Sequence, residues 1–272
     1  MSSYEQFISF GVDAFGIERF LRGVQATCQI FANTPAAASL TNIPISEFIA
    51  FGATLNLARR FIRTWRFLDC FSTSQALYNG SSGPTLELWL DITRLSLFGI
   101  YGLLETATLP DLSGVTGFGP QMTKQINLEA QKFWFAALAC GIVAGASRLL
   151  SLYAHAPVPQ ADEVYDLADG AGDGKDEKKA AEARLKKKQQ GEEERAQRAA
   201  AKASVLRKTA VDAIDMVIPS SVLRWIAVDT ATVGWAMLLS TFLSGYDVWA
   251  RCGVQLRQAK AAKAPMAKVS KS

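Results

Sequence analysis

Apolar side chains recur every three or four residues along most of the chain, which is the period of an α-helix. From Phe10 to Phe31 the apolar positions share one face, and the polar residues Glu18, Arg19 and Arg22 share the other. The triplet Asn33-Thr34-Pro35 ends this segment. The pattern predicts an all-α fold that begins with an amphipathic helix.

A second helix is predicted from Ser46, a residue type that favours N-caps, to about Phe71. It contains four apolar residues that follow the spacing i, i+4, i+8, i+11 and so form one stripe: Leu57, Phe61, Trp65 and Leu68. The same helix carries four arginines within eight residues, and they supply its basic face: Arg59, Arg60, Arg63 and Arg66.

A basic face opposite Phe, Trp and Leu is typical of a helix that lies in a membrane interface. The four apolar residues are therefore candidate membrane-inserting residues, and the four arginines are candidate ligands of lipid headgroups. The alternative is a surface helix of a soluble bundle with a solvated arginine face.

A third helix is predicted from about Thr85 to Ala107, and it is amphipathic only in its first half. Residues Leu95 to Leu104 carry no charge, but a bilayer span takes about 20 residues. This half is expected to be buried against other helices or to dip into the membrane. Residues Pro110 to Pro120, with three glycines, predict a loop.

Two segments approach the length of a membrane span, namely Phe133 to Tyr153 and Thr230 to Trp249. In the first, the small residues Ala137, Gly141 and Gly145 repeat every fourth position. Small residues at this spacing let two helices approach closely in lipid, which predicts self-association into a homo-oligomer. The alternative for this segment is a core helix of a soluble bundle.

The chain divides by composition into five regions. These are residues 1–110, an amphipathic helical membrane-remodelling region; 127–155, a first apolar membrane helix; 156–204, a charged low-complexity linker; 205–250, a C-terminal apolar helical region; and 251–272, a basic tail. The linker has no large apolar residue beyond Leu185 in its Lys- and Glu-rich part, which favours a tether or a solvated single helix. By the positive-inside rule, two spans would place both basic ends in the cytosol.

Composition argues against several other classes of function. The net charge is +4, and the aromatic residues Phe61 and Trp65 lie opposite the arginines, so they are badly placed to stack on nucleic-acid bases. The four cysteines are far apart, and the only histidine is His155. Neither a nucleophile-base pair, a phosphate-binding loop nor a metal constellation is present, so we expect no catalytic residue and no cofactor.

Several blocks of the sequence resemble the peroxin-11 family of peroxisomal membrane proteins. The resemblance covers Ile17 to Gln25, Leu55 to Asp69, the Lys132-Phe133-Trp134 entry to an apolar segment, Asp212 to Pro219, and Tyr246 to Trp249. The order of the blocks carries more weight than any one of them. The chain departs from the family pattern in its long charged insert and in Asp229, which lies inside the last apolar region.

The resemblance implies a peroxisomal membrane protein that bends and elongates the membrane before fission. It implies peroxisome proliferation as the outcome and the membrane fission machinery as a partner, while the arginines predict that the membrane lipids are anionic. The alternative is a pore for small metabolites lined by Asp91, Arg94 and Asp229, because ionisable residues at membrane depth ordinarily mark a transport path.

Overall fold

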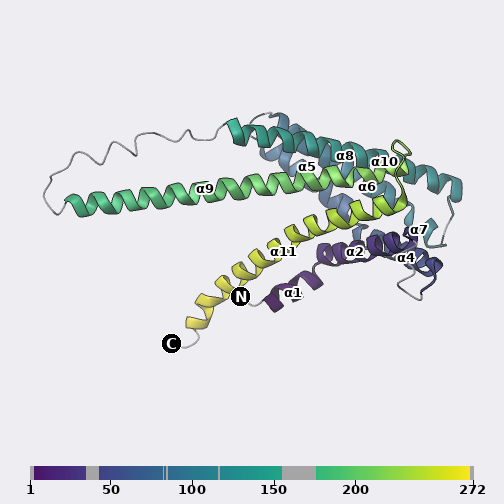
Figure 1. Cartoon of the computed structure of the whole chain (residues 1–272), viewed down its shortest axis with the longest axis horizontal. Coiled ribbons are helices and arrows are strands. Elements are labelled where there is room, and N and C mark those ends of the chain that lie inside the picture. Colours follow the sequence, from purple (N-terminus) through teal and green to yellow (C-terminus); the bar gives the residue numbers. More distant parts are fainter. Residues whose placement is uncertain are drawn as a thin grey trace. The chain divides into compact units, whose positions relative to one another are not determined.

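The computed structural model describes residues 3–34, 43–81, 83, 85–115, 117–154 and 176–269, and all regular elements among them are helices (Figure 1). The all-α prediction is therefore confirmed for the described residues. The helices are α1 (Ser3–Val12), α2 (Ala14–Asn33), α4 (Ile45–Arg63), α5 (Arg66–Gly80), α6 (Leu86–Ala107), α7 (Leu109–Leu112), α8 (Pro120–Ala154), α9 (Asp176–Asp215), α10 (Val217–Val222) and α11 (Thr230–Val269).

The chain divides into two compact units, residues 1–144 with 209–272, and residues 145–208. In the first unit α2 packs against both α4 and α11, α5 packs against α6, and α1 packs against α11. In the second unit the end of α8 meets α9, where the Lys202 ammonium lies 4.1 Å from the centroid of the Tyr153 ring.

Several predicted helix boundaries are confirmed. The α2 helix ends at Asn33, and α6 begins where the sequence indicated, because the Thr85 hydroxyl accepts a hydrogen bond of 3.2 Å from the Leu88 amide. The first predicted helix, however, is two helices. The Asp13 carboxylate accepts hydrogen bonds from the amides of Phe15 and Gly16 and so caps a new helix, α2.

The prediction of one helix from Ser46 to Phe71 is wrong, because α4 ends at Arg63 and α5 begins at Arg66. Gly52 does not interrupt α4. The break at Thr64 is held by a contact between helices: the Thr106 hydroxyl of α6 donates a 3.0 Å hydrogen bond to the Thr64 carbonyl oxygen. A partner 42 residues away in the sequence thus fixes a break that local helical periodicity does not reveal.

Among the described residues, α8 is the one helix that is long and apolar enough to cross a membrane. It contains the first predicted span. The second predicted span, residues 230–249, is not confirmed as one. It forms the first half of α11, where threonine, serine and glycine residues interrupt the apolar ones.

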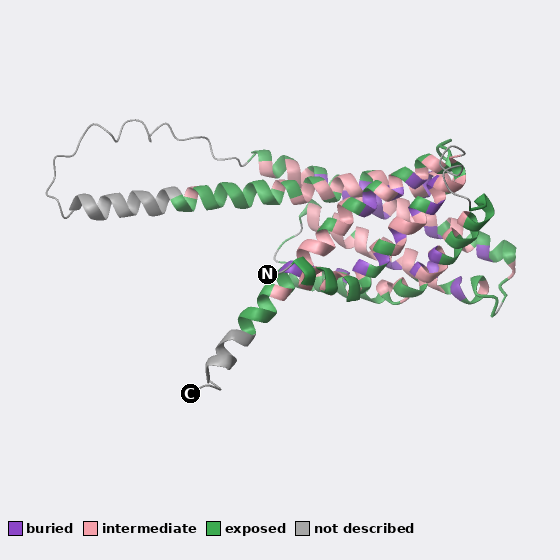
Figure 2. Cartoon of the chain, turned by 60° about the horizontal axis from the view of Figure 1, so that its bottom comes forward, coloured by how far each residue is buried: buried purple, intermediate pink, exposed green. Residues whose placement is uncertain are grey.

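The predicted linker and basic tail are largely helical in the described residues. Residues 156–175 lie outside them, but α9 starts at Asp176, and its side chains from Gln189 to Ala201 are exposed except at Gly191 (Figure 2). This part is the solvated helix rather than the tether. The tail from Arg251 continues α11 as far as Val269 instead of forming a separate region.

Candidate functional site

The predicted membrane-inserting residues lie on the surface of the first unit. Phe61 is 54%, Trp65 72% and Leu68 52% exposed, whereas Leu57 is half-buried. We call Phe61, Trp65 and Leu68 the aromatic face. Phe61 lies in the last turn of α4, Trp65 at the break and Leu68 in the first turn of α5. Exposed apolar side chains that are grouped in this way are expected where a surface meets an apolar partner.

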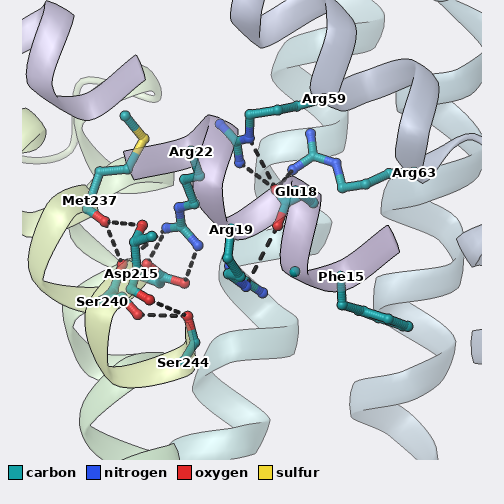
Figure 3. Close-up of polar contacts among 12 residues, drawn as sticks. Phe15, Glu18, Arg19, Arg22, Arg59, Arg63, Asp215, Met237, Ser240 and Ser244 are labelled. Atoms are coloured by element: carbon teal, nitrogen blue, oxygen red, sulfur yellow. Dashed lines mark hydrogen bonds and ion pairs between the residues drawn. The ribbon is translucent and has the colours of Figure 1, made fainter. Parts of the chain in front are cut away.

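The arginines of the same segment are turned into the protein, which the sequence did not lead us to expect. Arg59 is only 5% exposed, and its Nε and Nη2 atoms donate hydrogen bonds of 3.0 and 2.7 Å to Glu18 Oε1 (Figure 3). Its Nη1 atom donates to Gln25 Oε1 at 2.6 Å. The expectation of an exposed arginine face is therefore wrong for Arg59, because α2 supplies a buried carboxylate that periodicity alone does not locate.

Arg63 and Arg60 are also engaged within the chain. Arg63 Nη2 donates to Glu105 Oε1 at 2.8 Å, and its Nη1 lies 3.4 Å from Glu18 Oε1. Arg60 Nη1 donates to Asn127 Oδ1 at 2.9 Å, and its Nε lies 3.5 Å from Glu105 Oε1. We call Arg59, Arg60, Arg63, Glu18 and Glu105 the arginine cluster. It ties α4 to α2, α6 and α8.

Arg66, the fourth predicted headgroup ligand, is half-buried at the start of α5. Its guanidinium carbon lies 4.7 Å from the centroid of the Phe15 ring, and the guanidinium carbon of Arg251 lies 4.7 Å from the same centroid. Phe15 thus joins α5 and α11 through two cation–π contacts. Headgroup binding by the four arginines stays a prediction, and it would require these contacts to open.

The charges in the arginine cluster stabilise one another. Burial would raise the pKa of the Glu18 carboxyl, but the positive charges of Arg19, Arg59 and Arg63 outweigh burial and hold this pKa well below its ordinary value. Burial and the nearby Glu105 carboxylate raise the pKa of Tyr101 to about 12, so its hydroxyl stays protonated and donates to Glu105 Oε1 at 3.1 Å. At neutral pH the cluster is a set of hydrogen-bonded ion pairs.

A second buried pair joins α2 to the C-terminal half of the chain. Arg22 Nη1 and Nη2 donate hydrogen bonds of 3.2 and 2.5 Å to the Asp215 carboxylate, and Nη2 also donates to the Ser240 hydroxyl at 3.1 Å (Figure 3). The sequence predicted no role for Asp215. Asp215 occurs with Asp212 in an otherwise apolar stretch, and this could have indicated a buried ion pair, because a buried carboxylate needs a basic or hydrogen-bonding partner.

A third pair lies against the small-residue stripe of α8. Arg94 Nη2 donates to Asp212 Oδ1 at 2.7 Å, and a Cβ atom on Gly141 would lie 2.7 Å from Arg94 Nε and would also collide with Asp212. Ala137, Gly141 and Gly145 are all buried within the chain. The close approach that these residues permit is used inside the protein, so in this structure the stripe is not accessible to a second copy.

The residues proposed to line a pore have separate roles. Arg94 pairs with Asp212, whereas the exposed Asp229 caps α11 by accepting a 3.0 Å hydrogen bond from the Thr232 amide. Asp91 is half-buried on α6. Across the described residues, no group of three or more His, Cys, Asp or Glu side chains is placed to hold a metal ion.

Comparison with known proteins identifies the family. A family model described as peroxisomal biogenesis factor 11 (PEX11) matches residues 4–249 of the chain. A search of curated proteins and a search of solved structures each gave no significant match. The matched model describes a biogenesis factor and not a known family of enzymes. The chain belongs to the PEX11 family, whose members act in peroxisome biogenesis and proliferation at the peroxisomal membrane.

Proposed function

We propose that this protein bends and elongates the peroxisomal membrane by inserting its aromatic face into one leaflet. One observation carries the proposal: Phe61, Trp65 and Leu68 are exposed, while Arg59, Arg60 and Arg63 of the same segment are held inside by carboxylates. The apolar side chains can then meet lipid while these three arginines stay paired inside the protein.

Insertion of the aromatic face is favourable and asymmetric. Moving a large apolar side chain from water into an apolar environment contributes about 1.5–3 kcal/mol as an upper figure. The three side chains occupy area in one leaflet only, and area added to a single leaflet curves the membrane toward the other. The ordering of side chains and lipids offsets part of the gain, so stable residence in the membrane is assigned to α8.

The arginine cluster has a positioning role in this proposal. Arg59 and Arg63 both bind Glu18, and Arg63 also binds Glu105, so α4 is held at a fixed rotation against α2 and α6. A fixed rotation keeps Phe61 on the outer side of α4. Loss of the cluster would free the helix to turn its apolar face inward.

Several parts of the proposal come from the sequence rather than from the geometry. Cytosolic placement of both termini follows from the positive-inside rule, a preference for anionic lipids from the arginines, and assembly into homo-oligomers from the small-residue stripe of α8, whereas the link to the membrane fission machinery comes from the family resemblance. Because the α8 stripe is buried, any self-association would use another surface.

The test compares two matched double variants of the full chain in proteoliposomes. We expect Phe61→Ser with Trp65→Ser to incorporate normally but to draw few tubules in electron micrographs, because little apolar area remains to insert. The control is Trp235→Ser with Phe242→Ser, which removes the same two residue types from exposed positions on α11.

In cells the first variant should reach peroxisomes and fail to elongate them, while the control elongates them normally. Tubulation by the first variant at the parent level would refute the proposal. Equal loss in both variants would do so as well, because it would show a general need for apolar surface instead of a specific role for the aromatic face.

A further inference from the structure

A second apolar surface lies on α1, outside the aromatic face. Tyr4, Phe7, Ile8 and Val12 follow the spacing i, i+3, i+4, i+8, so they share one side of the helix. All four are exposed, and Phe7 is 63% exposed. Gly11 lies on the same side and is also exposed. This side of α1 therefore carries no charge.

The opposite side of α1 is attached to α11. Glu5 Oε2 lies 2.6 Å from the Lys260 ammonium, Gln6 Nε2 donates a 2.8 Å hydrogen bond to the Trp249 carbonyl oxygen, and the Phe10 ring lies 6.0 Å from the Trp249 ring. Figure 1 shows α1 beside the C-terminal half of α11. The rotation that exposes Phe7 is thus fixed by three contacts on the other side.

The corner between α1 and α2 fixes the same orientation. The Asp13 carboxylate caps α2 and also accepts a 2.8 Å hydrogen bond from Arg251 Nη2. Gly16 is required at this corner, because a Cβ atom there would collide with the Phe10 carbonyl oxygen. Gly253 allows the approach on the α11 side, since a Cβ atom there would lie 2.8 Å from Gln6 Nε2.

The charges around α1 indicate which partner fits this apolar side. The acidic residue of α1, Glu5, is already paired with Lys260. From Arg251 onward the sequence contains no acid and six bases, which are Arg251, Arg257, Lys260, Lys263, Lys268 and Lys271. Asp13 and Glu5 compensate Arg251 and Lys260, so the segment keeps an excess of positive charge. An apolar side without charge next to a basic segment is complementary to an anionic bilayer, whose surface is negative and whose interior is apolar.

We propose that α1 is a second membrane contact of this protein, lying in the headgroup region of an anionic bilayer with Tyr4, Phe7, Ile8 and Val12 among the acyl chains. The basic part of α11 supplies the attraction to the headgroups. A second copy of the chain is a poorer partner, because an isologous contact between two α1 surfaces brings two basic segments together. The proposal does not depend on the aromatic face.

The test uses the full chain in proteoliposomes with the photoreactive residue p-benzoylphenylalanine at one position. Phe7→p-benzoylphenylalanine should form lipid adducts in vesicles of phosphatidylcholine with phosphatidylserine. Phe10→p-benzoylphenylalanine is the matched control, because Phe10 faces Trp249 and should cross-link within the chain. We expect position 7 to give several-fold more lipid adduct than position 10.

Two further measurements isolate the contribution of charge and the independence of α1. Omitting phosphatidylserine, or changing Arg257→Gln with Lys263→Gln, should reduce the adduct at position 7 several-fold. Adding Phe61→Ser with Trp65→Ser should leave it unchanged, so failure of the aromatic-face proposal is distinguishable from failure of this one.

Three results would overturn the inference. One is a cross-link from position 7 to a second protein chain in place of lipid. Another is equal lipid adduct at positions 7 and 10. The third is an adduct at position 7 that does not respond to phosphatidylserine or to the loss of basic residues, which would remove the anionic surface as the partner.

Discussion

Glu18 is the residue on which three arginines converge. Its carboxylate lies 2.7 Å from Arg59, 3.4 Å from Arg63 and 3.5 Å from Arg19. Removing one partner of a buried ion pair leaves the other charge uncompensated, which costs about 3–5 kcal/mol. The stability of the first unit therefore depends strongly on this one carboxylate.

Glu18→Gln should lower the free energy of unfolding by about 3–5 kcal/mol in detergent micelles, measured by tryptophan fluorescence during denaturant titration. Glu129→Gln is the matched control, because Glu129 pairs with Lys132 on the surface of α8, where such pairs contribute little. Equal stability of the two variants would show that the arginine cluster does not hold the helices together.

Glu18→Gln should also change how the free energy of unfolding depends on pH. An unfolded Glu18 takes up a proton near its ordinary pKa of 4.5, whereas the folded carboxylate keeps its charge at that pH because its pKa is lowered. The unfolded state then binds more protons, so the stability that Glu18 contributes is present above about pH 4.5 and decreases as the pH falls below it. Glu18→Gln should lack this part of the acid destabilisation.

Gly141 lacks a side chain, and this allows α8 to pack closely against the Arg94–Asp212 pair. Gly141→Ala should destabilise the fold, because its Cβ would displace the Arg94–Asp212 pair, and a lost buried partner costs about 1–3 kcal/mol or more. Gly191→Ala on α9 is the control, since nothing lies within 4 Å of its Cβ and alanine favours a helix. Thermal melts that shift equally would argue against the packing described for α8.

At the scale of helices, periodicity located the helical segments but neither the breaks at Asp13 and Thr64 nor the orientation of the helices. The spacing of Leu57, Phe61, Trp65 and Leu68 correctly grouped polar against apolar positions around Arg59. It did not reveal that the polar side faces inward, because a period identifies two faces without saying which one meets the core. The partners that decide this, Glu18 and Glu105, lie 41 and 42 residues from the arginines they bind.

Local caps were predicted in part. The sequence placed the start of α6 at Thr85, whose hydroxyl caps that helix, but the predicted cap Ser46 lies inside α4, and Asp13, which caps α2, was not predicted. The break at Thr64 depends on Thr106, and the orientation of α2 depends on Asp215, which is 193 residues from Arg22. Such long-range contacts leave no periodic signal, so neither feature was predicted.

The exposed part of α9 leads to a prediction about one element. Replacing residues 162–202 by a short flexible segment should leave the melting temperature and membrane shaping largely unchanged. The reason is that the described side chains from Gln189 to Ala201 are exposed and so make few contacts with the rest of the protein. The deletion spares Asp212 and Asp215. Asp215→Asn in the otherwise intact chain should be the more damaging change, because it leaves Arg22 without its buried counter-ion.

For the whole molecule, the apolar helix α8 and the exposed apolar side chains predict stable membrane residence. The protein should remain in the pellet when membranes are washed with alkaline carbonate, which releases peripheral proteins. Its distribution is measured by immunoblot against a peripheral and an integral marker. Release of most of the protein into the supernatant would contradict membrane embedding of α8.

The pairing of Arg22 with Asp215 also sets an order of events during synthesis. Ribosomes add roughly 5–20 residues per second, so the 193 residues between the two partners take roughly 10–40 s to translate. Throughout that interval the N-terminal helices exist without the counter-ion of Arg22 and without Ser240. The interior of the first unit is therefore completed only after Asp215 and Ser240 have been synthesised, long after the N-terminal helices that they join.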